Sequence, residues 1–191
     1  DERAKLIAES RFREPLAVPA AGLGIDGRLL EPIHRRVERI HGLLGEEDPN
    51  ASIPLALVAA YQGEESETRA LAERGIALAE AADNAFVAGW HRGVLGLLES
   101  WSGDRTRAVE LFSVAMEARR AAGFREPGSP LYLVDYVEAL VQLGRINDAL
   151  SLLEPWEAHA IRLQRDWVIA QTTRCRGQIA AARGVFDEAD R

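Results

Sequence analysis

The sequence has 191 residues, of which 47% are hydrophobic and 28% charged, as in a globular domain or a short repeat array. The net charge of −7 argues against nucleic-acid binding as the main role, because phosphate binding needs clustered Lys and Arg. The single cysteine, Cys175, excludes an intrachain disulfide and favours a cytoplasmic location. No apolar run reaches the roughly 20 residues that a membrane span needs, so we expect no membrane contact.

Amphipathic stretches dominate the chain and strand-like alternation is scarce, so the sequence predicts an all-α protein. Residues 1–50 are expected to hold leading helices and a loop, packed as a degenerate unit. Their elements are a charged helix over 1–13, a loop rich in Pro and Gly over 15–27, and an amphipathic helix over 28–44. Further helices are predicted at 54–62, 66–82, 84–102, 106–122, 130–143, 147–164, 166–183 and from 186 onward.

Glycines recur at the predicted turns with steps of 40, 41 and 40 residues. They are Gly63, Gly103, Gly144 and Gly184. A tight turn between antiparallel helices needs a residue that adopts positive φ, which glycine does readily. The spacing therefore predicts an internal repeat of helix pairs.

Small residues flank these turns. An alanine follows the turn glycine by five residues at positions 108, 149 and 189; in the first unit we align Ala70 there, with Glu64 and Glu65 as two extra residues. Gly96 and Gly177 precede their turn glycines by seven residues. We expect these small side chains where two helix axes approach closely.

This Gly-x4-Ala pattern with an earlier glycine resembles the tetratricopeptide repeat over about 50–191. The resemblance implies a right-handed superhelix of stacked antiparallel helix pairs. Its units would be about 51–82, 84–122, 129–164 and a truncated 166–191. The period is longer than the usual 34 residues, and Pro155 is expected to kink or break one second helix.

Four segments also resemble the helical middle region of large ATP-binding transcriptional regulators of the LuxR type, which are bacterial. They are DYVEAL (135–140), LLEPWEAHA (152–160), RDW (165–167) and RCRGQIAAARG (174–184). The resemblance implies a non-catalytic sensor or protein-interaction domain that couples effector or partner binding to DNA-binding activity. ATP would belong to a missing upstream module and DNA contact to a missing C-terminal module, so no cofactor is expected in this chain.

The tetratricopeptide resemblance further implies a concave groove, lined by the first helix of each pair, that binds a protein, a peptide or a small-molecule effector. With the turn glycine at position fifteen of the repeat, the groove residues are Trp90, Leu97 and Trp101, then Asp135, Glu138 and Gln142, then Gln171, Arg174 and Gln178. Tryptophans would supply contact area and charges would set orientation. Packing of Trp90 and Trp101 between helices, and plain solvation of Asp135 and Glu138, stay open as alternatives.

Other motifs do not favour enzyme chemistry. GLGIDG (22–27) has dinucleotide-binding spacing, but no strand precedes it. His34, Glu38 and His41 share a helix side with arginines that would repel a metal ion. Cys175 is expected to be a partly buried packing residue. The remaining alternative function is an adaptor scaffold that binds a protein tail, and the apolar edge of the truncated last pair would allow a homodimer.

Overall fold

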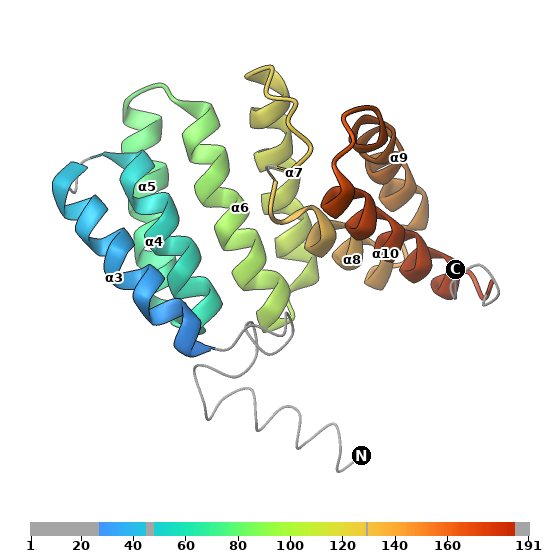
Figure 1. Ribbon diagram of the computed structural model, residues 1–191, viewed down its shortest axis with the longest axis horizontal. Helices are drawn as coiled ribbons and strands as arrows, with labels where there is room; N and C mark the ends of the chain where they lie inside the picture. Colours follow the sequence, from blue (N-terminus) through green and yellow to red (C-terminus); the bar gives the residue numbers. More distant parts are fainter. Residues whose placement is uncertain (1–26, 45–47, 129, 186–191) are drawn as a thin grey trace, which may run out of the picture.

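A computed structural model describes residues 27–44, 48–128 and 130–185, which form helices and connections with no strand (Figure 1). The all-α prediction is therefore confirmed for this part of the chain. The helices predicted over 1–13 and from 186, and the loop over 15–27, lie outside it, apart from Gly27. The described helices are α3 (Gly27–Leu44), α4 (Pro49–Gln62), α5 (Glu65–Ala81), α6 (Ala85–Ser102), α7 (Arg105–Ala121), α8 (Leu133–Gln142), α9 (Ile146–Arg162) and α10 (Asp166–Ala182).

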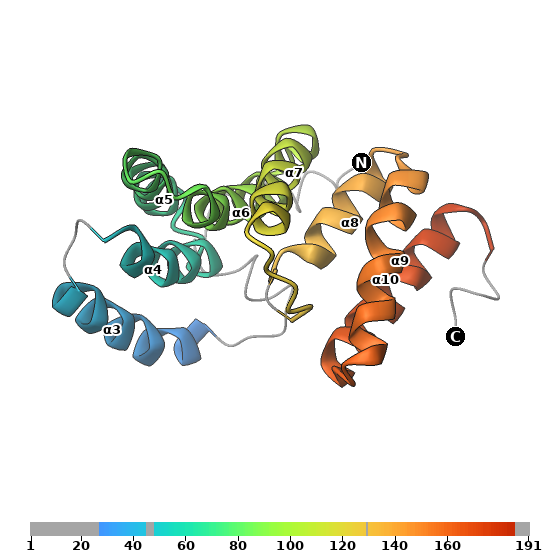
Figure 2. The same ribbon diagram turned by 90° about the horizontal axis from the view of Figure 1, so that it is seen from above.

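Each helix packs against the next one in the chain, as expected for stacked helix pairs (Figures 1 and 2). The first helices of the pairs also contact one another in succession, α4 with α6, α6 with α8, and α8 with α10. The second helices do not: the α5–α7 and α7–α9 pairs make at most marginal contact. None of the described helices combines the length and the apolar character that crossing a membrane would require.

A residue with positive φ follows each helix from α4 to α10, and successive ones are 20 or 21 residues apart. These residues are Gly63, Asp83, Gly103, Gly123, Gly144, Gln164 and Gly184, with φ between 53° and 100°. At six of the seven ends, the next backbone N–H donates to the carbonyl five residues back, which closes the helix in a Schellman motif. The four predicted turn glycines are confirmed, and the remaining three reveal a rhythm of single helices.

The predicted alignment of the first unit is wrong by two residues. Thr68 is fully buried in the position that Ala108 and Ala149 occupy in the later units, whereas Ala70 is exposed. The Thr68 hydroxyl donates to the Glu64 carbonyl at 2.9 Å, so this polar side chain is satisfied inside the interface. The first unit therefore has no two-residue insertion.

Gly96 lies where α6 and α7 come closest. A Cβ atom at this position would lie 2.5 Å from the ring of Phe112, which is fully buried. Phe112 in turn stacks on Tyr132 with ring centroids 5.2 Å apart and also contacts Tyr136 at 5.5 Å. The predicted close approach at Gly96 is confirmed, and it lets one aromatic cluster join the second pair to the third.

Three predicted boundaries differ from the structure. Helix α4 begins at Pro49 rather than at 54, because the Asp48 carboxylate accepts the Asn50 N–H at 2.8 Å and caps it. Helix α8 begins at Leu133 rather than at 130; Ser129, the predicted cap, lies outside the described residues. Pro155 lies inside α9 without ending it, so the expectation of a break is wrong.

Replacing Gly96 by Ala should lower the free energy of unfolding by about 1–3 kcal/mol, because the new methyl group overlaps the Phe112 ring. Urea denaturation measures the change. Gly42→Ala in α3 is the matched control: no atom lies within 4 Å of its Cβ position, so we expect a gain of up to about 1 kcal/mol. Equal effects of the two substitutions would contradict the close approach.

The left-handed positions give a second prediction. Gly144→Ala should cost about 1 kcal/mol, because φ is 72° there and nothing within 4 Å would touch the methyl group. Gln164→Gly should instead raise stability by about 0.5–1 kcal/mol, because it relieves a non-glycine residue at φ 53°. Thermal and urea unfolding of both variants checks the opposite signs, and a loss in both would contradict the argument.

Candidate functional site

Six of the nine predicted groove residues form one connected surface, which we call the first-helix surface. Its members are Trp101 on α6, Asp135, Glu138 and Gln142 on α8, and Arg174 and Gln178 on α10. All three helices are first members of their pairs. The surface therefore crosses three successive repeats.

The aromatic end of this surface is anchored by hydrogen bonding and ring packing. The Trp101 indole N–H donates to Asp135 Oδ1 at 3.0 Å, which links α6 to α8. The ring of Tyr61 on α4 lies 5.3 Å from the Trp101 ring. The indole is thus half-buried between neighbouring repeats, and part of the predicted alternative, packing between helices, holds for Trp101.

Asp135 carries an unusual charge for its surroundings. Burial raises the pKa of Asp135 to about 6, and the nearby Glu138 carboxylate raises it further, while the Trp101 hydrogen bond and the charge of Arg174 oppose the shift. The carboxylate is therefore held in a strained ionised state at neutral pH. Plain solvation does not describe this residue.

Glu138 is the hub of the polar part. Its Oε1 accepts from the Gln142 amide at 3.0 Å and its Oε2 from the Gln178 amide at 3.2 Å. The guanidinium of Arg174 lies 3.9 Å from Oε2 and remains exposed. Arg105, the first residue of α7, donates to Gln142. One carboxylate thus organises donors from α8 and α10 around an exposed cation.

The other three predicted residues lie elsewhere. Leu97 is only 1% exposed and packs in the core with Phe112, so its side chain lines no surface. Trp90 meets Phe86 edge-on at 6.4 Å and lies eleven residues before Trp101, about 16 Å along the helix. Gln171 is half-buried on α10, about two turns before Gln178.

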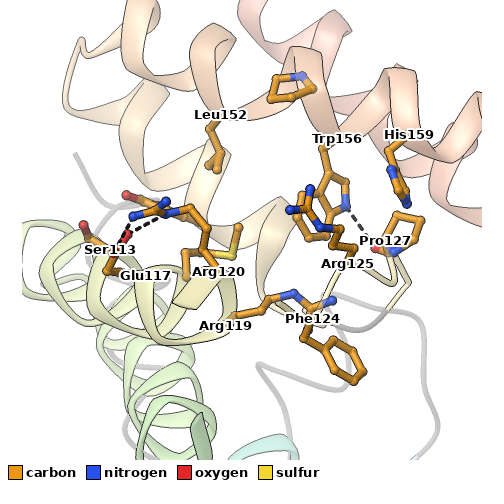
Figure 3. A pocket seen from close by; sticks show the side chains of 13 residues that line it. Ser113, Glu117, Arg119, Arg120, Phe124, Arg125, Pro127, Leu152, Trp156 and His159 are labelled. Atoms are coloured by element: carbon orange, nitrogen blue, oxygen red, sulfur yellow. Dashed lines mark hydrogen bonds and ion pairs between the residues drawn. The ribbon is translucent and has the colours of Figure 1, made fainter. Parts of the chain in front are cut away.

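A cleft of about 600 Å³ opens between α7 and α9, and we call it the α7–α9 cleft (Figure 3). Its walls come from α7, the 122–132 connection, Tyr136 on α8, and α9. The sequence analysis treated this connection only as a loop and assigned no site there. One signal was available: the repeat positions Ala59, Ala79, Ala160 and Ala180 are small, whereas the same position on α7 is Arg119.

Arg119 is 4% exposed, which is rare for a charged side chain. Its guanidinium lies 4.5 Å from the centre of the Phe124 ring and 5.5 Å from that of Trp156, and it donates to the Glu126 carbonyl. Burial lowers the pKa of Arg119, although the group stays charged at neutral pH. The cleft therefore contains a cation held between two aromatic rings.

Two buried groups that invite chemical interpretation are packing residues. Cys175 is fully buried, and burial raises the pKa of its thiol to about 12, which keeps it protonated and unreactive. His91 is also fully buried, with Nε2 2.8 Å from the Pro49 carbonyl, and burial lowers its pKa. Neither side chain faces the first-helix surface or the cleft.

No protein-family model, no curated protein and no solved structure matches this chain, so no family is identified. The stacked helix pairs are shown by the structure itself. The resemblance to LuxR-type regulators continues to depend on the four sequence segments that carry it.

Asp135→Asn should stabilise the protein at pH 7.5 by about 1–3 kcal/mol, because it removes the charge and keeps an oxygen that accepts the Trp101 N–H. A folded-state pKa of about 6, above the usual 3.8, favours the fold below pH 3.8, and this contribution is lost as the pH rises through 6. The gain should therefore shrink as the pH falls to 4, which urea titrations at both pH values measure.

The matched control for this prediction is Asp148→Asn, on the first turn of α9. Asp148 is exposed and lies 2.7 Å from Arg145, so the substitution should change stability by less than about 0.5 kcal/mol at both pH values. A stability difference for Asp135→Asn that does not vary with pH would contradict the buried-charge argument.

Proposed function

We propose that the helix pairs form a tetratricopeptide-like, right-handed superhelix with the first helices on its inner side. The contacts between α4, α6, α8 and α10, against the marginal contacts among α5, α7 and α9, support this arrangement. In a curved stack, the elements on the inner side are closer together than those on the outer side. The first-helix surface would then line the concave face.

On this basis we propose that the chain is a non-catalytic sensor or protein-interaction domain whose first-helix surface binds an extended peptide segment or another effector. The supporting observation is the continuity of the surface across three repeats, from the Trp101 ring through Glu138 to Arg174. Aromatic area next to fixed charges and amides is the composition that peptide-binding faces use. An extended segment suits a surface that repeats from one helix pair to the next.

The proposed biological setting is a bacterial, cytoplasmic LuxR-type transcriptional regulator. In this setting, occupation of the first-helix surface would favour one curvature or one self-association state and so bias a DNA-binding module elsewhere in the protein. The four sequence segments in 135–184 support this setting. A tetratricopeptide adaptor that binds a protein tail uses the same surface without the link to DNA, and the contacts described here favour it equally.

The binding proposal can be tested with peptides selected from a random phage-displayed library against the wild-type chain. We expect the selected peptides to lose about tenfold or more in affinity for Glu138→Gln or Arg174→Gln, because each variant removes a charge-assisted hydrogen bond. Isothermal titration calorimetry with the same peptides gives the affinities. Peptides whose affinity is unaffected by both variants would contradict the assignment.

Matched controls come from Arg107 and Glu110, an exposed pair on α7 with an N–O distance of 2.8 Å. Arg107→Gln and Glu110→Gln remove the same charges away from the first-helix surface, and peptide affinity should stay within about twofold. To separate regulator from adaptor, DNA occupancy by the intact gene product is measured by chromatin immunoprecipitation. Occupancy that does not respond to Glu138→Gln would contradict the regulator setting.

A further inference from the structure

We propose that the α7–α9 cleft is a second binding site, whose ligand is a small organic anion with a carboxylate attached to a flat, apolar ring system. This site is independent of the first-helix surface. Its walls include the second helices α7 and α9, whereas the first-helix surface lies on α6, α8 and α10. The volume of about 600 Å³ is within the range of small-molecule sites.

The charge of the cleft selects an anion. Three guanidinium groups line it, those of Arg119, Arg120 and Arg125, against a single carboxylate, that of Glu117. Arg120 is neutralised by Glu117 through two hydrogen bonds of 2.6 and 2.9 Å. The positive charge of Arg119 and Arg125 is thus concentrated locally in a chain whose net charge is −7.

The position of Arg119 in the repeat strengthens the argument. Helices α5 and α9 place Ala79 and Ala160 here, both fully buried, and these alanines need no partner. An arginine in a buried packing position loses hydration, which disfavours its charged form and favours an anion beside it. Packing alone would be served better by a small apolar residue.

The apolar walls define the rest of the ligand. The Trp156 indole N–H donates to the Pro127 carbonyl at 2.9 Å, which fixes the ring plane at the wall of the cleft (Figure 3). Phe124 is 42% exposed beside it, and Leu152 and Pro155 line the same cavity. Rigid aromatic and prolyl surfaces favour a flat ring system over a flexible chain.

His159 supplies a neutral donor at the same cleft. Arg162 can only donate, and its Nη2 lies 2.7 Å from His159 Nδ1, so Nδ1 accepts and the ring proton lies on Nε2. The Nε2–H group is then available to an anion that enters the cleft. A carboxylate with two oxygens can engage this donor together with a guanidinium group.

The proposal is tested with 1-naphthoate and its neutral isostere 1-naphthamide, titrated into the full chain by calorimetry at low salt. We expect naphthoate to bind at least about tenfold more tightly than naphthamide, since only the carboxylate forms charge-assisted hydrogen bonds. Quenching of tryptophan fluorescence should accompany binding and should weaken in Trp156→Leu. Equal affinity of the two probes, or no binding of naphthoate at millimolar concentration, would overturn the proposal.

Three variants locate the site. Arg125 is exposed, so Arg125→Gln should keep the fold while naphthoate affinity falls about tenfold and naphthamide affinity does not change. Arg119→Gln should have the same selective effect, and circular dichroism verifies that it folds. Arg107→Gln, on the opposite end of α7, should leave both affinities unchanged. Naphthoate affinity that survives Arg119→Gln and Arg125→Gln would overturn the site, whereas loss of peptide binding in Glu138→Gln concerns only the first-helix surface.

Discussion

The constraint on which the fold depends is the left-handed residue that follows each helix from α4 to α10. It ends the helix, reverses the chain and closes the last turn with a backbone hydrogen bond, as from Glu64 N–H to the Ala59 carbonyl. Because these residues recur every 20 or 21 positions, successive helices start in equivalent places. Equivalent small residues then meet at each crossing, and the pairs stack in register with one another.

Much of this fold could be predicted from the sequence, because glycine at a turn and apolar spacing along a helix are local signals. Gly103 and Gly144 identified the period, and the helix limits followed within a few residues. The single-helix rhythm could not be read, because Asp83 and Gln164 adopt positive φ without being glycine. The alignment of the first unit failed for a similar reason: Thr68 replaces alanine, and its hydroxyl is satisfied only by a backbone carbonyl three-dimensionally at hand.

The candidate site was predictable where it followed from repeat geometry. Positions on successive first helices must face the same way, so Trp101, Asp135 and Glu138 could be grouped without coordinates, and the structure links them by hydrogen bonds and charge. Leu97 failed because the same helix face turns toward Phe112. The cleft could not be predicted, because it depends on how far two second helices separate, which no local pattern encodes.

The separation of α7 from α9 has a specific origin in the chain. The left-handed residues Gly123 and Gly144 keep the spacing of 21, so nothing has been inserted between them. Instead, Pro127 and Pro130 lie where the first turns of a helix are expected, and α8 begins only at Leu133. About half of a first helix is therefore replaced by irregular chain. That substitution removes packing volume beside α7, and Arg119, Phe124 and Trp156 lie at the cavity it leaves. A defect in the repeat, rather than the repeat itself, thus creates the most enclosed binding volume of the described residues.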